Sequence, residues 1–347
     1  MTARDALTAA RATLPAALPA PRATLPAARH GGVDGPAAVG ARIMRNVGTV
    51  VHGRTAAIEL VTCAILAGGH ALIEDVPGSG KTTLARAFAR SLGGTFARVQ
   101  ATADLLPTDI TGTGMWDPDA RTFVFVPGPL FAHVVLVDEL NRTPPRTQSA
   151  FLEAMDESAV TVDGRRHALP EPFFVVATQN PLEQHGTYPL PEGQLDRFAV
   201  CVRLGPLDLA AERLVVREQL MRATVEDLNA VVDPVELQVA RQAVRSTHVE
   251  DAVLDHALCV VRATRTDPRV RVGASPRAAL SLVRCAQARA VLHGRDYVVP
   301  DDTKALAAAV LVHRLVPAAG LYGAIRSGTA QAVVADIVDR LPIPPRA

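Results

Sequence analysis

Apolar residues recur at two different spacings along this chain, and the spacing separates two regions. From residue 41 to 68 they recur every three to four positions, with a break at His52-Gly53, which predicts two helices joined by a turn. Short apolar runs then alternate with helical segments as far as residue 205, a pattern typical of a parallel sheet covered by helices. Residues 206–347 are rich in alanine, valine and arginine at helical spacing, which predicts an all-α domain.

The first apolar run, residues 71–74, leads into a glycine-rich turn and then a helix. The turn is Pro77-Gly78-Ser79-Gly80, and the helix begins with Lys81-Thr82-Thr83. The backbone N–H groups of such a turn and the positive end of the helix dipole meet at one point, which predicts a phosphate cradle. Lys81 would reach the β- and γ-phosphates, and the Thr82 hydroxyl would hold Mg²⁺. The usual motif has glycine in place of Asp75, and a Gly-Ser-Gly turn before a helix also occurs without this function.

The next apolar runs place polar residues at the same edge of the predicted sheet. Residues 134–137 end in Asp138 and Glu139. A carboxylate beside the cradle can bind the Mg²⁺ shell, the role expected of Asp138, and Glu139 can polarise the attacking water. Residues 173–178 deliver Asn180 to this edge, where its side chain can orient that water. Capping of the next turn is the alternative role for Asn180.

The turn at Gly53 is a further candidate contact, because a turn ahead of such a cradle can cover the adenine ring. An ordinary helix break is the alternative explanation of that glycine. We therefore expect ATP and Mg²⁺ as cofactors, with Thr82 and Asp138 as metal ligands. The predicted nucleotide contacts are Gly53, Pro77, Gly78, Ser79, Gly80, Lys81, Thr82 and Thr83.

Two β-hairpins are predicted between the apolar runs. Residues 113–116 and 122–126 flank a polar turn and contain the only tryptophan of the chain. This hairpin could contact another macromolecule, or its aromatic side chains could clamp it onto its own domain, and the pattern leaves both interpretations open. The second hairpin, residues 160–168, turns at Asp163-Gly164.

Charge and cysteine content narrow the class of protein. The net charge of +1 provides no basic excess for binding nucleic acid or an anionic membrane. The four cysteines lack the spacing of a zinc site, which fits a reducing cytoplasm. No apolar run has the length of a membrane span. We therefore expect a cytoplasmic protein without membrane insertion or stable nucleic-acid binding.

The first 40 residues form a low-complexity segment with two copies of Arg-Ala-Thr-Leu-Pro-Ala-Ala. Its prolines break helices and it has few residues with which to build a core, so residues 1–40 are predicted to be a disordered tail. A docking peptide for a partner is the alternative interpretation.

Taken together, the motifs of this chain resemble those of the MoxR branch of the AAA+ ATPases, in the helix-2-insert clade. The resemblance implies an AAA+ P-loop core over residues 41–205, with a parallel five-stranded sheet flanked by helices and β-hairpin inserts. An all-α lid domain would then span residues 206–347. The segments that carry the resemblance include Glu74-Asp-Val-Pro-Gly-Ser-Gly-Lys-Thr82, Asp138-Glu-Leu-Asn-Arg142, Ala177-Thr-Gln-Asn-Pro181, Gln194-Leu-Asp-Arg-Phe198 and Gly273-Ala-Ser-Pro-Arg-Ala278.

The resemblance also implies roles that the spacing does not show. Asn180 looks like the sensor-1 residue, Arg277 like the sensor-2 arginine of the lid, and Arg197 like an arginine finger that enters the neighbouring subunit's site. With Lys81 and Glu139, these residues would form the catalytic set of an ATP hydrolase. Such an arginine can contribute roughly 10³ to 10⁵ in rate in related enzymes.

Family members form homo-oligomeric rings, typically hexamers, and act as chaperone-like remodellers or maturation factors. They often work with a protein that carries a von Willebrand factor A domain. The resemblance therefore implies a ring ATPase that remodels, matures or activates a client protein, and the sequence does not identify that client. A nucleotide-gated interaction scaffold with little turnover is an alternative. A nucleic-acid motor is a third hypothesis, which the near-neutral charge disfavours.

Overall fold

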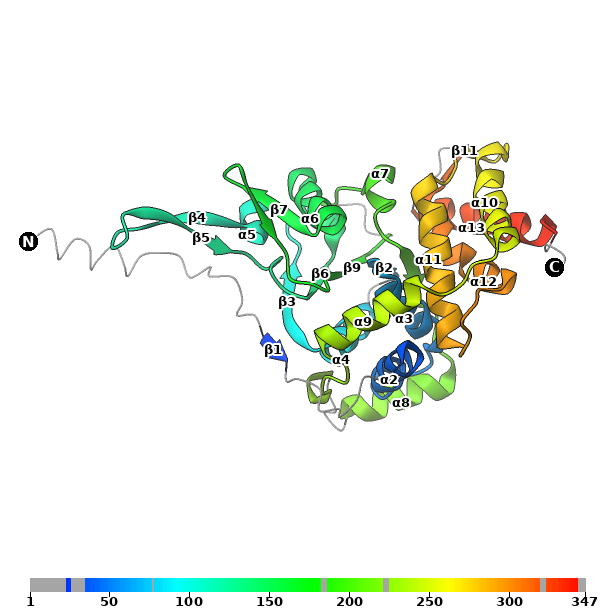
Figure 1. The fold of residues 1–347 in the computed structure, drawn as a ribbon, viewed down its shortest axis with the longest axis horizontal. Coiled ribbons are helices and arrows are strands. Elements are labelled where there is room, and N and C mark those ends of the chain that lie inside the picture. The colour runs from blue at the N-terminus through cyan, green and yellow to red at the C-terminus, as the bar shows by residue number, and fades with distance from the viewer. Residues whose placement is uncertain are drawn as a thin grey trace, which may run out of the picture.

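A six-stranded sheet forms the centre of the protein in the computed structural model (Figure 1), which describes residues 23–25, 35–76, 78–181, 186–220, 225–318 and 323–342. The strand order is β1-β3-β6-β9-β2-β10. Five of these strands run parallel, which confirms the predicted five-stranded parallel sheet, and β1 (Ala23–Leu25) pairs antiparallel with β3 at the edge. The parallel strands are β2 (Ala71–Glu74), β3 (Gly94–Gln100), β6 (Val134–Asp138), β9 (Phe174–Gln179) and β10 (Val200–Arg203).

The central strands are apolar throughout because both faces of the sheet are covered. In β6, Val134 and Leu136 belong to one hydrophobic core, whereas Val135 and Val137 belong to another. The first core includes residues of α2 (Pro36–Gly48), α3 (Thr55–Ala67) and α4 (Lys81–Ser91). The second includes residues of α6 (Pro145–Glu157). Helices on both faces are what a parallel sheet of continuous apolar runs requires.

Two N-terminal helices precede the sheet, and the first of them corrects the predicted tail. Helix α2 (Pro36–Gly48) begins inside the predicted segment 1–40, and α3 (Thr55–Ala67) follows. Proline is suited to the first helical turn, where its missing N–H has no partner to lose. Val39 and Ile43 of α2 are fully buried, so residues 36–40 are part of the folded domain. Residues 1–22 and 26–34 of the predicted tail lie outside the described residues.

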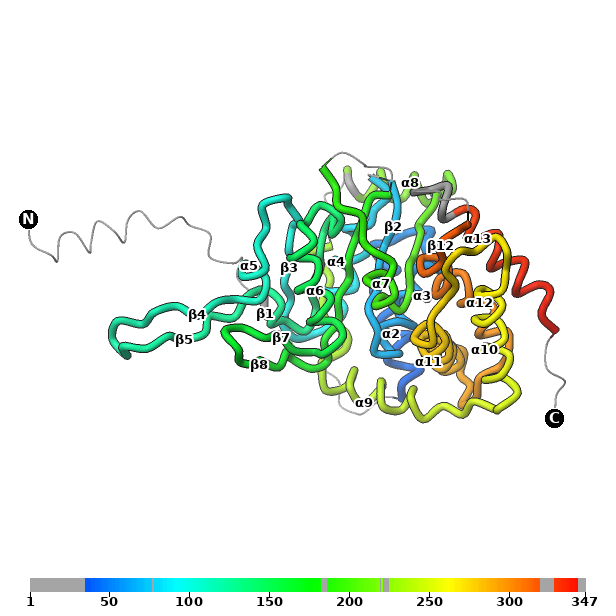
Figure 2. Tube along the Cα trace, turned by 90° about the horizontal axis from the view of Figure 1, so that it is seen from above, coloured from blue at the N-terminus to red at the C-terminus, as the bar shows by residue number. Residues whose placement is uncertain are grey.

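Both predicted hairpins are present. The first pairs β4 (Gly112–Asp117) with β5 (Thr122–Pro127) and directly follows the short helix α5 (Pro107–Thr111). The second pairs β7 (Ala159–Val162) with β8 (Arg165–Ala168). The β4–β5 hairpin projects from the body of the molecule (Figures 1 and 2). Near its tip, Trp116 and Phe123 are more than half exposed, whereas Phe125 stacks on His167 at 4.0 Å between ring centroids. One aromatic therefore clamps the hairpin to the second hairpin, and the other two face solvent.

The region after β10 is helical, with one exception. The exception is a short antiparallel pair, β11 (Val270–Val272) with β12 (Val316–Pro317), within the region predicted to be the helical lid. The short helix α7 (Glu192–Leu195) precedes β10. None of the described helices is long and apolar enough to cross a membrane. The helices after β10 are α8 (Leu209–Leu220), α9 (Pro234–Arg245), α10 (Asp251–Thr266), α11 (Pro276–Leu292), α12 (Pro300–Leu311) and α13 (Gly323–Arg340).

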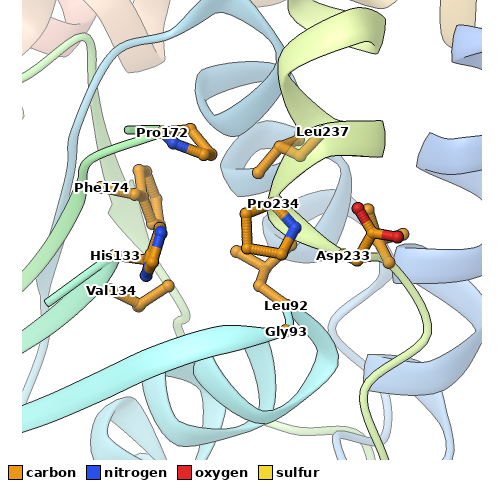
Figure 3. Close-up of a pocket in the computed structure, with 10 residues that line it drawn as sticks. Leu92, Gly93, His133, Val134, Pro172, Phe174, Asp233, Pro234 and Leu237 are labelled. Carbon is orange, nitrogen blue, oxygen red and sulfur yellow. The ribbon is translucent and has the colours of Figure 1, made fainter. Parts of the chain in front are cut away.

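Helix α9 joins this region to the sheet. At its first turn, the Pro234 ring faces the His133 and Phe174 rings, which stand at the starts of β6 and β9 (Figure 3). The crevice between them has a volume of only about 10 Å³, room for no more than a water molecule. This contact is therefore packing between the two regions and not a ligand site.

Candidate active site

The loop between β2 and α4 has the backbone of a phosphate cradle. Gly78 and Gly80 have φ angles of 79° and 91°, a region that glycine occupies without steric cost. Apart from the adjacent residues of the loop, no atom of the described residues lies within 4 Å of the position that a Cβ would take at either glycine, so the loop is open on that side. Helix α4 begins directly afterwards at Lys81, and Thr83 is exposed on its first turn. Pro77 lies outside the described residues.

Asp75, which departs from the usual motif, fixes this loop to the rest of the sheet edge. Its Oδ2 accepts hydrogen bonds from the backbone N–H groups of Leu204 at 3.0 Å and Gly205 at 2.8 Å. The Lys81 ammonium donates to the carbonyl oxygens of Asp75 and, at 3.0 Å, of Val76. The carboxylate therefore ties the loop to the segment after β10, while Lys81 curls over the loop.

Asp138 lies next to Thr82, as a shared metal site would require. The Thr82 hydroxyl is 3.2 Å from Asp138 Oδ1, and the Thr178 hydroxyl is 3.4 Å from the same oxygen. Arg98 Nε donates to Asp138 Oδ2 at 2.7 Å. The Asp138 side chain is only 4% exposed, so this carboxylate is compensated by its neighbours. A hydroxyl and a carboxylate are oxygen ligands of the kind that Mg²⁺ prefers.

Glu139 follows in a backbone conformation that is uncommon for a residue other than glycine. Its φ of 59° and ψ of 48° are left-handed, and its N–H donates to the Thr178 hydroxyl at 3.0 Å. The carboxylate is partly exposed and lies 3.0 Å from Arg142 Nε and 3.4 Å from Gln100 Nε2. Such strain persists only where the surroundings enforce it, and it is common at active sites.

Asn180 completes the polar residues at this edge. It directly follows β9, which pairs with both β2 and β6, and it is buried. Its carbonyl oxygen accepts a hydrogen bond from Asn141 Nδ2 at 3.3 Å. Lys81, Asp138 and Asn180 therefore stand at the carboxyl ends of neighbouring parallel strands.

Two further observations bear on the predicted nucleotide contacts. The buried Ser79 hydroxyl has no hydrogen-bond partner among the described residues, so the loop holds an unused polar group. A Cβ on Gly53, where φ is 66°, would lie 2.6 Å from the Cβ of Ala211 in α8. Close packing against α8 is thus sufficient reason for glycine here, and its contact with adenine stays a prediction. The open loop, the unused hydroxyl and the Thr82–Asp138 pair together fit a nucleotide with Mg²⁺.

The structure places Arg197 and Arg277 together, away from Lys81. Asp156 near the end of α6 binds both, with its Oδ2 2.7 Å from Arg197 Nε and its Oδ1 2.9 Å from Arg277 Nη1. They line a cavity whose wall includes His70, Phe173 and Ala199. These three residues directly precede β2, β9 and β10, so the cavity lies at the amino edge of the sheet.

The helical region holds this amino edge in place. Ser275, the N-cap of α11, donates a hydrogen bond to Asp196 Oδ2 at 2.8 Å. Arg314 Nε lies 2.9 Å from Asp196 Oδ1, and its side chain is almost fully buried. Arg197, the neighbour of Asp196, is thereby fixed between the sheet and α11.

Sequence reasoning missed three residues of the carboxyl edge, namely Arg98, Gln100 and Thr178. All three contact Asp138 or Glu139. A signal was present in β3: its last residue, Gln100, pairs in register with Asp138, and Arg98 lies two positions earlier on the same face. Because register is a property of the folded sheet, this signal could not be used before the pairing was known.

Comparison with known proteins agrees with this architecture. Residues 70–200 match the model of the ATPase family associated with various cellular activities, and residues 262–337 match the model of an AAA lid domain. The chain is 42% identical to the uncharacterized protein YeaC of Bacillus subtilis, over 87% of this chain and 94% of YeaC. It is 38% identical to the chaperone MoxR1 of Mycobacterium tuberculosis, over 82% and 78% of the two chains.

A third curated relative and a solved structure extend the comparison. The protein MoxR of Methylorubrum extorquens is 33% identical, over 79% of this chain and 87% of the relative. A crystal structure from Cytophaga hutchinsonii, provisionally named an ATPase, superposes with a TM-score of 0.79 at 33% identity. It covers 89% of this chain, and this chain covers 96% of it.

Proposed function

Because the chain belongs to the MoxR family of AAA+ ATPases, we propose that it hydrolyses ATP to remodel, mature or activate a client protein. The observation that carries this proposal is the carboxyl edge of the sheet, where an open glycine loop meets a set of charged and polar side chains. That set is Lys81, Thr82, Asp138, Glu139 and Asn180.

The roles at this edge follow from the chemistry of phosphoryl transfer, which depends on positioning and charge neutralisation. Lys81 would leave the carbonyl oxygens of the loop and bind the β- and γ-phosphates. Thr82 and Asp138 would hold Mg²⁺, which neutralises phosphate charge when it is bound. Glu139 would orient and polarise the attacking water from its fixed left-handed backbone, and Asn180 would orient the same water.

A ring assembly belongs to the same proposal. Arg197 and Arg277 face away from the Lys81 edge of their own chain, an arrangement that suits arginines which act on the nucleotide of a neighbouring subunit. The family relationship supports a homo-oligomeric ring, with a hexamer as the expected form and a von Willebrand factor A domain protein as partner. The relative named a chaperone supports a client protein as the target.

We place this activity in the cytoplasm as part of the proposal. The four cysteines of the chain are all unpaired in the structure, as is usual where thiols are kept reduced. Proteins that co-purify with an ATP-bound, hydrolysis-deficient Glu139→Gln ring would include the client and the partner.

The direct test is steady-state ATP hydrolysis by the purified chain and its variants. Glu139→Gln should lower kcat by about 10² to 10⁴ while ATP still binds, because only water activation is lost. Lys81→Ala should lose both binding and turnover. Glu153→Gln, an exposed glutamate on α6, is the matched control and should keep the parental rate. A Glu139→Gln enzyme that hydrolyses ATP at the parental rate would rule out this role for Glu139.

A further inference from the structure

The cavity at the amino edge of the sheet is strongly cationic. It has a volume of about 400 Å³ and lies where the sheet meets α9 and α11. Its acidic residues are Asp156 and Glu171, and five arginines outnumber them, so the formal charge of its wall is +3. The arginines are Arg197, Arg241, Arg245, Arg277 and Arg284.

The arginines fall into two groups. Arg197 and Arg277 already share the carboxylate of Asp156. Arg245 and Arg284, on α9 and α11, are exposed and form no side-chain hydrogen bond or ion pair with any described residue. Asp156 therefore neutralises the arginines on one side of the cavity, whereas Arg245 and Arg284 on the other side have no paired carboxylate among the described residues.

Arg241 is the innermost member of the second group. It is only 6% exposed, and its Nε donates to the carbonyl oxygen of Ile65 at 2.8 Å. Its Nη2 is buried without a hydrogen-bond partner among the described residues. Burial and the neighbouring charge of Arg245 lower the pKa of Arg241 to about 10, still well above neutral pH. A buried guanidinium with an unused donor is costly unless something else accepts from it.

The single carboxylate on that side does not remove this excess charge. Glu171 is exposed and its Oε2 lies 3.5 Å from Gln238 Nε2, at the limit of a hydrogen bond. His70, on the wall of the cavity, stays neutral at pH 7, because burial lowers its pKa to about 4. Three guanidinium groups thus line one cavity with a single exposed carboxylate as counter-charge on their side.

We propose that this cavity is a second anion site, in which Arg241, Arg245 and Arg284 bind a small ligand of the phosphate class. Guanidinium groups match phosphate oxygens with paired N–H donors, and three of them can contact more than one phosphate. A cavity of about 400 Å³ is in the size range of small-molecule sites and larger than a single phosphate needs. The ligand is therefore a short polyphosphate or a molecule that carries one. The chain's own glycine loop lies at the opposite edge of the sheet. The three arginines are also distinct from Arg197 and Arg277 on the same wall, which the proposed ring assigns to the neighbour's nucleotide.

The test uses tripolyphosphate, inorganic phosphate and ATP as probes in isothermal titration of the Lys81→Ala chain, in which the glycine loop is disabled. Tripolyphosphate should bind, at least tenfold more tightly than phosphate, and its affinity should fall as salt is raised. The Arg245→Gln/Arg284→Gln pair should weaken it at least tenfold. Both side chains are exposed, so the fold should survive, which an unchanged melting temperature would verify.

The matched control is Arg262→Gln/Arg271→Gln, which removes two exposed arginines outside the cavity and should leave binding unchanged. Equal loss in the two pairs would reduce the effect to net charge and overturn the proposal. A failure of tripolyphosphate to bind would also overturn the proposal. The proposal would likewise fail if ATP bound but tripolyphosphate did not, because that result would indicate a site that recognises the base. Because Lys81→Ala removes hydrolysis and leaves the cavity intact, this site and the proposed ATPase can fail independently.

Discussion

The two edges of the central sheet carry opposite chemistry. At the carboxyl edge, Asp138 ends β6, Glu139 follows it, and the glycine loop follows β2, a combination suited to a nucleotide with its metal. At the amino edge, Arg197 and Arg277 meet on Asp156 beside further arginines. Because the strands run parallel, one chain cannot bring the two edges together. The comparison teaches that the residues of the proposed catalytic set lie at two separate edges of the chain, which is why the proposed ring would build each site from two subunits.

The largest expected effect comes from removing Arg197, the proposed arginine finger at the amino edge. Arg197→Ala should lower ATP turnover by about 10³ to 10⁵, because the negative charge on the transferred phosphate would no longer be stabilised by the guanidinium group of a neighbouring subunit. Arg166→Ala, which removes an exposed arginine of β8, is the control. The measurement is kcat for ATP hydrolysis in assembled rings of each variant. A kcat of Arg197→Ala close to that of the parent would show that Arg197 takes no part in catalysis.

The amino edge should also respond to acid. The pKa of His70 is lowered from 6.5 to about 4 by burial, so the unfolded chain takes up its proton at a higher pH than the folded chain. The free energy of unfolding should therefore fall as the pH drops from 6.5 to 4, by about 3 kcal/mol from this residue.

Denaturant unfolding of His70→Gln across this range should show a shallower loss of stability with falling pH than the parent. His248→Gln, an exposed histidine, should follow the parent curve. An unchanged slope in His70→Gln would mean that the acid sensitivity resides elsewhere.

At the carboxyl edge, Asp75→Gly restores the usual residue of the motif and tests what the aspartate does. It removes two hydrogen bonds to the segment after β10, so the free energy of unfolding should fall by about 2 kcal/mol. Turnover should change only severalfold, because Asp75 contacts the loop backbone and not the acidic pair. Thermal melting and an ATPase assay measure the two effects. A large loss of kcat with unchanged stability would instead assign Asp75 to the chemistry.

When all these effects are compared as free energies, the smallest is expected for Asp156→Asn, which loosens the two arginines without removing either. Loss of a charge-assisted hydrogen bond should lower kcat about tenfold and leave KM for ATP nearly unchanged. Glu157→Gln, the next residue in α6, serves as the control. A larger kcat in Asp156→Asn would show that the carboxylate competes for the arginines and does not position them.

The carboxyl edge could be predicted from the sequence because its signals are local. Each of its parts is a short apolar run followed directly by polar residues, and parallel strands bring such ends together. Strand β10, at residues 200–203, was not located, since its four residues include arginine and cysteine and are short for a periodicity argument. The start of α2 was missed because Pro36 lies within the proline-rich segment predicted as a tail and also begins a helix.

The amino edge could be predicted only in part. The roles of Arg197 and Arg277 came from family resemblance, but their meeting on Asp156 depends on how α6 and α11 pack. The anion site is assembled from α9, α11 and the residues before the strands, which are far apart in the chain. Nothing in the sequence around these arginines distinguishes them from surface arginines, and only the fold reveals that they line one cavity.

The most direct test of the account mixes two inactive subunits. Lys81→Ala chains lack a working carboxyl edge, and Arg197→Ala chains lack the finger of the amino edge. In rings that contain both, some interfaces pair an intact glycine loop with an intact Arg197, so ATP hydrolysis should return to a measurable fraction of the parental rate. If co-assembly is verified and the mixed rings stay as inactive as either variant alone, Arg197 does not act on a neighbour's nucleotide.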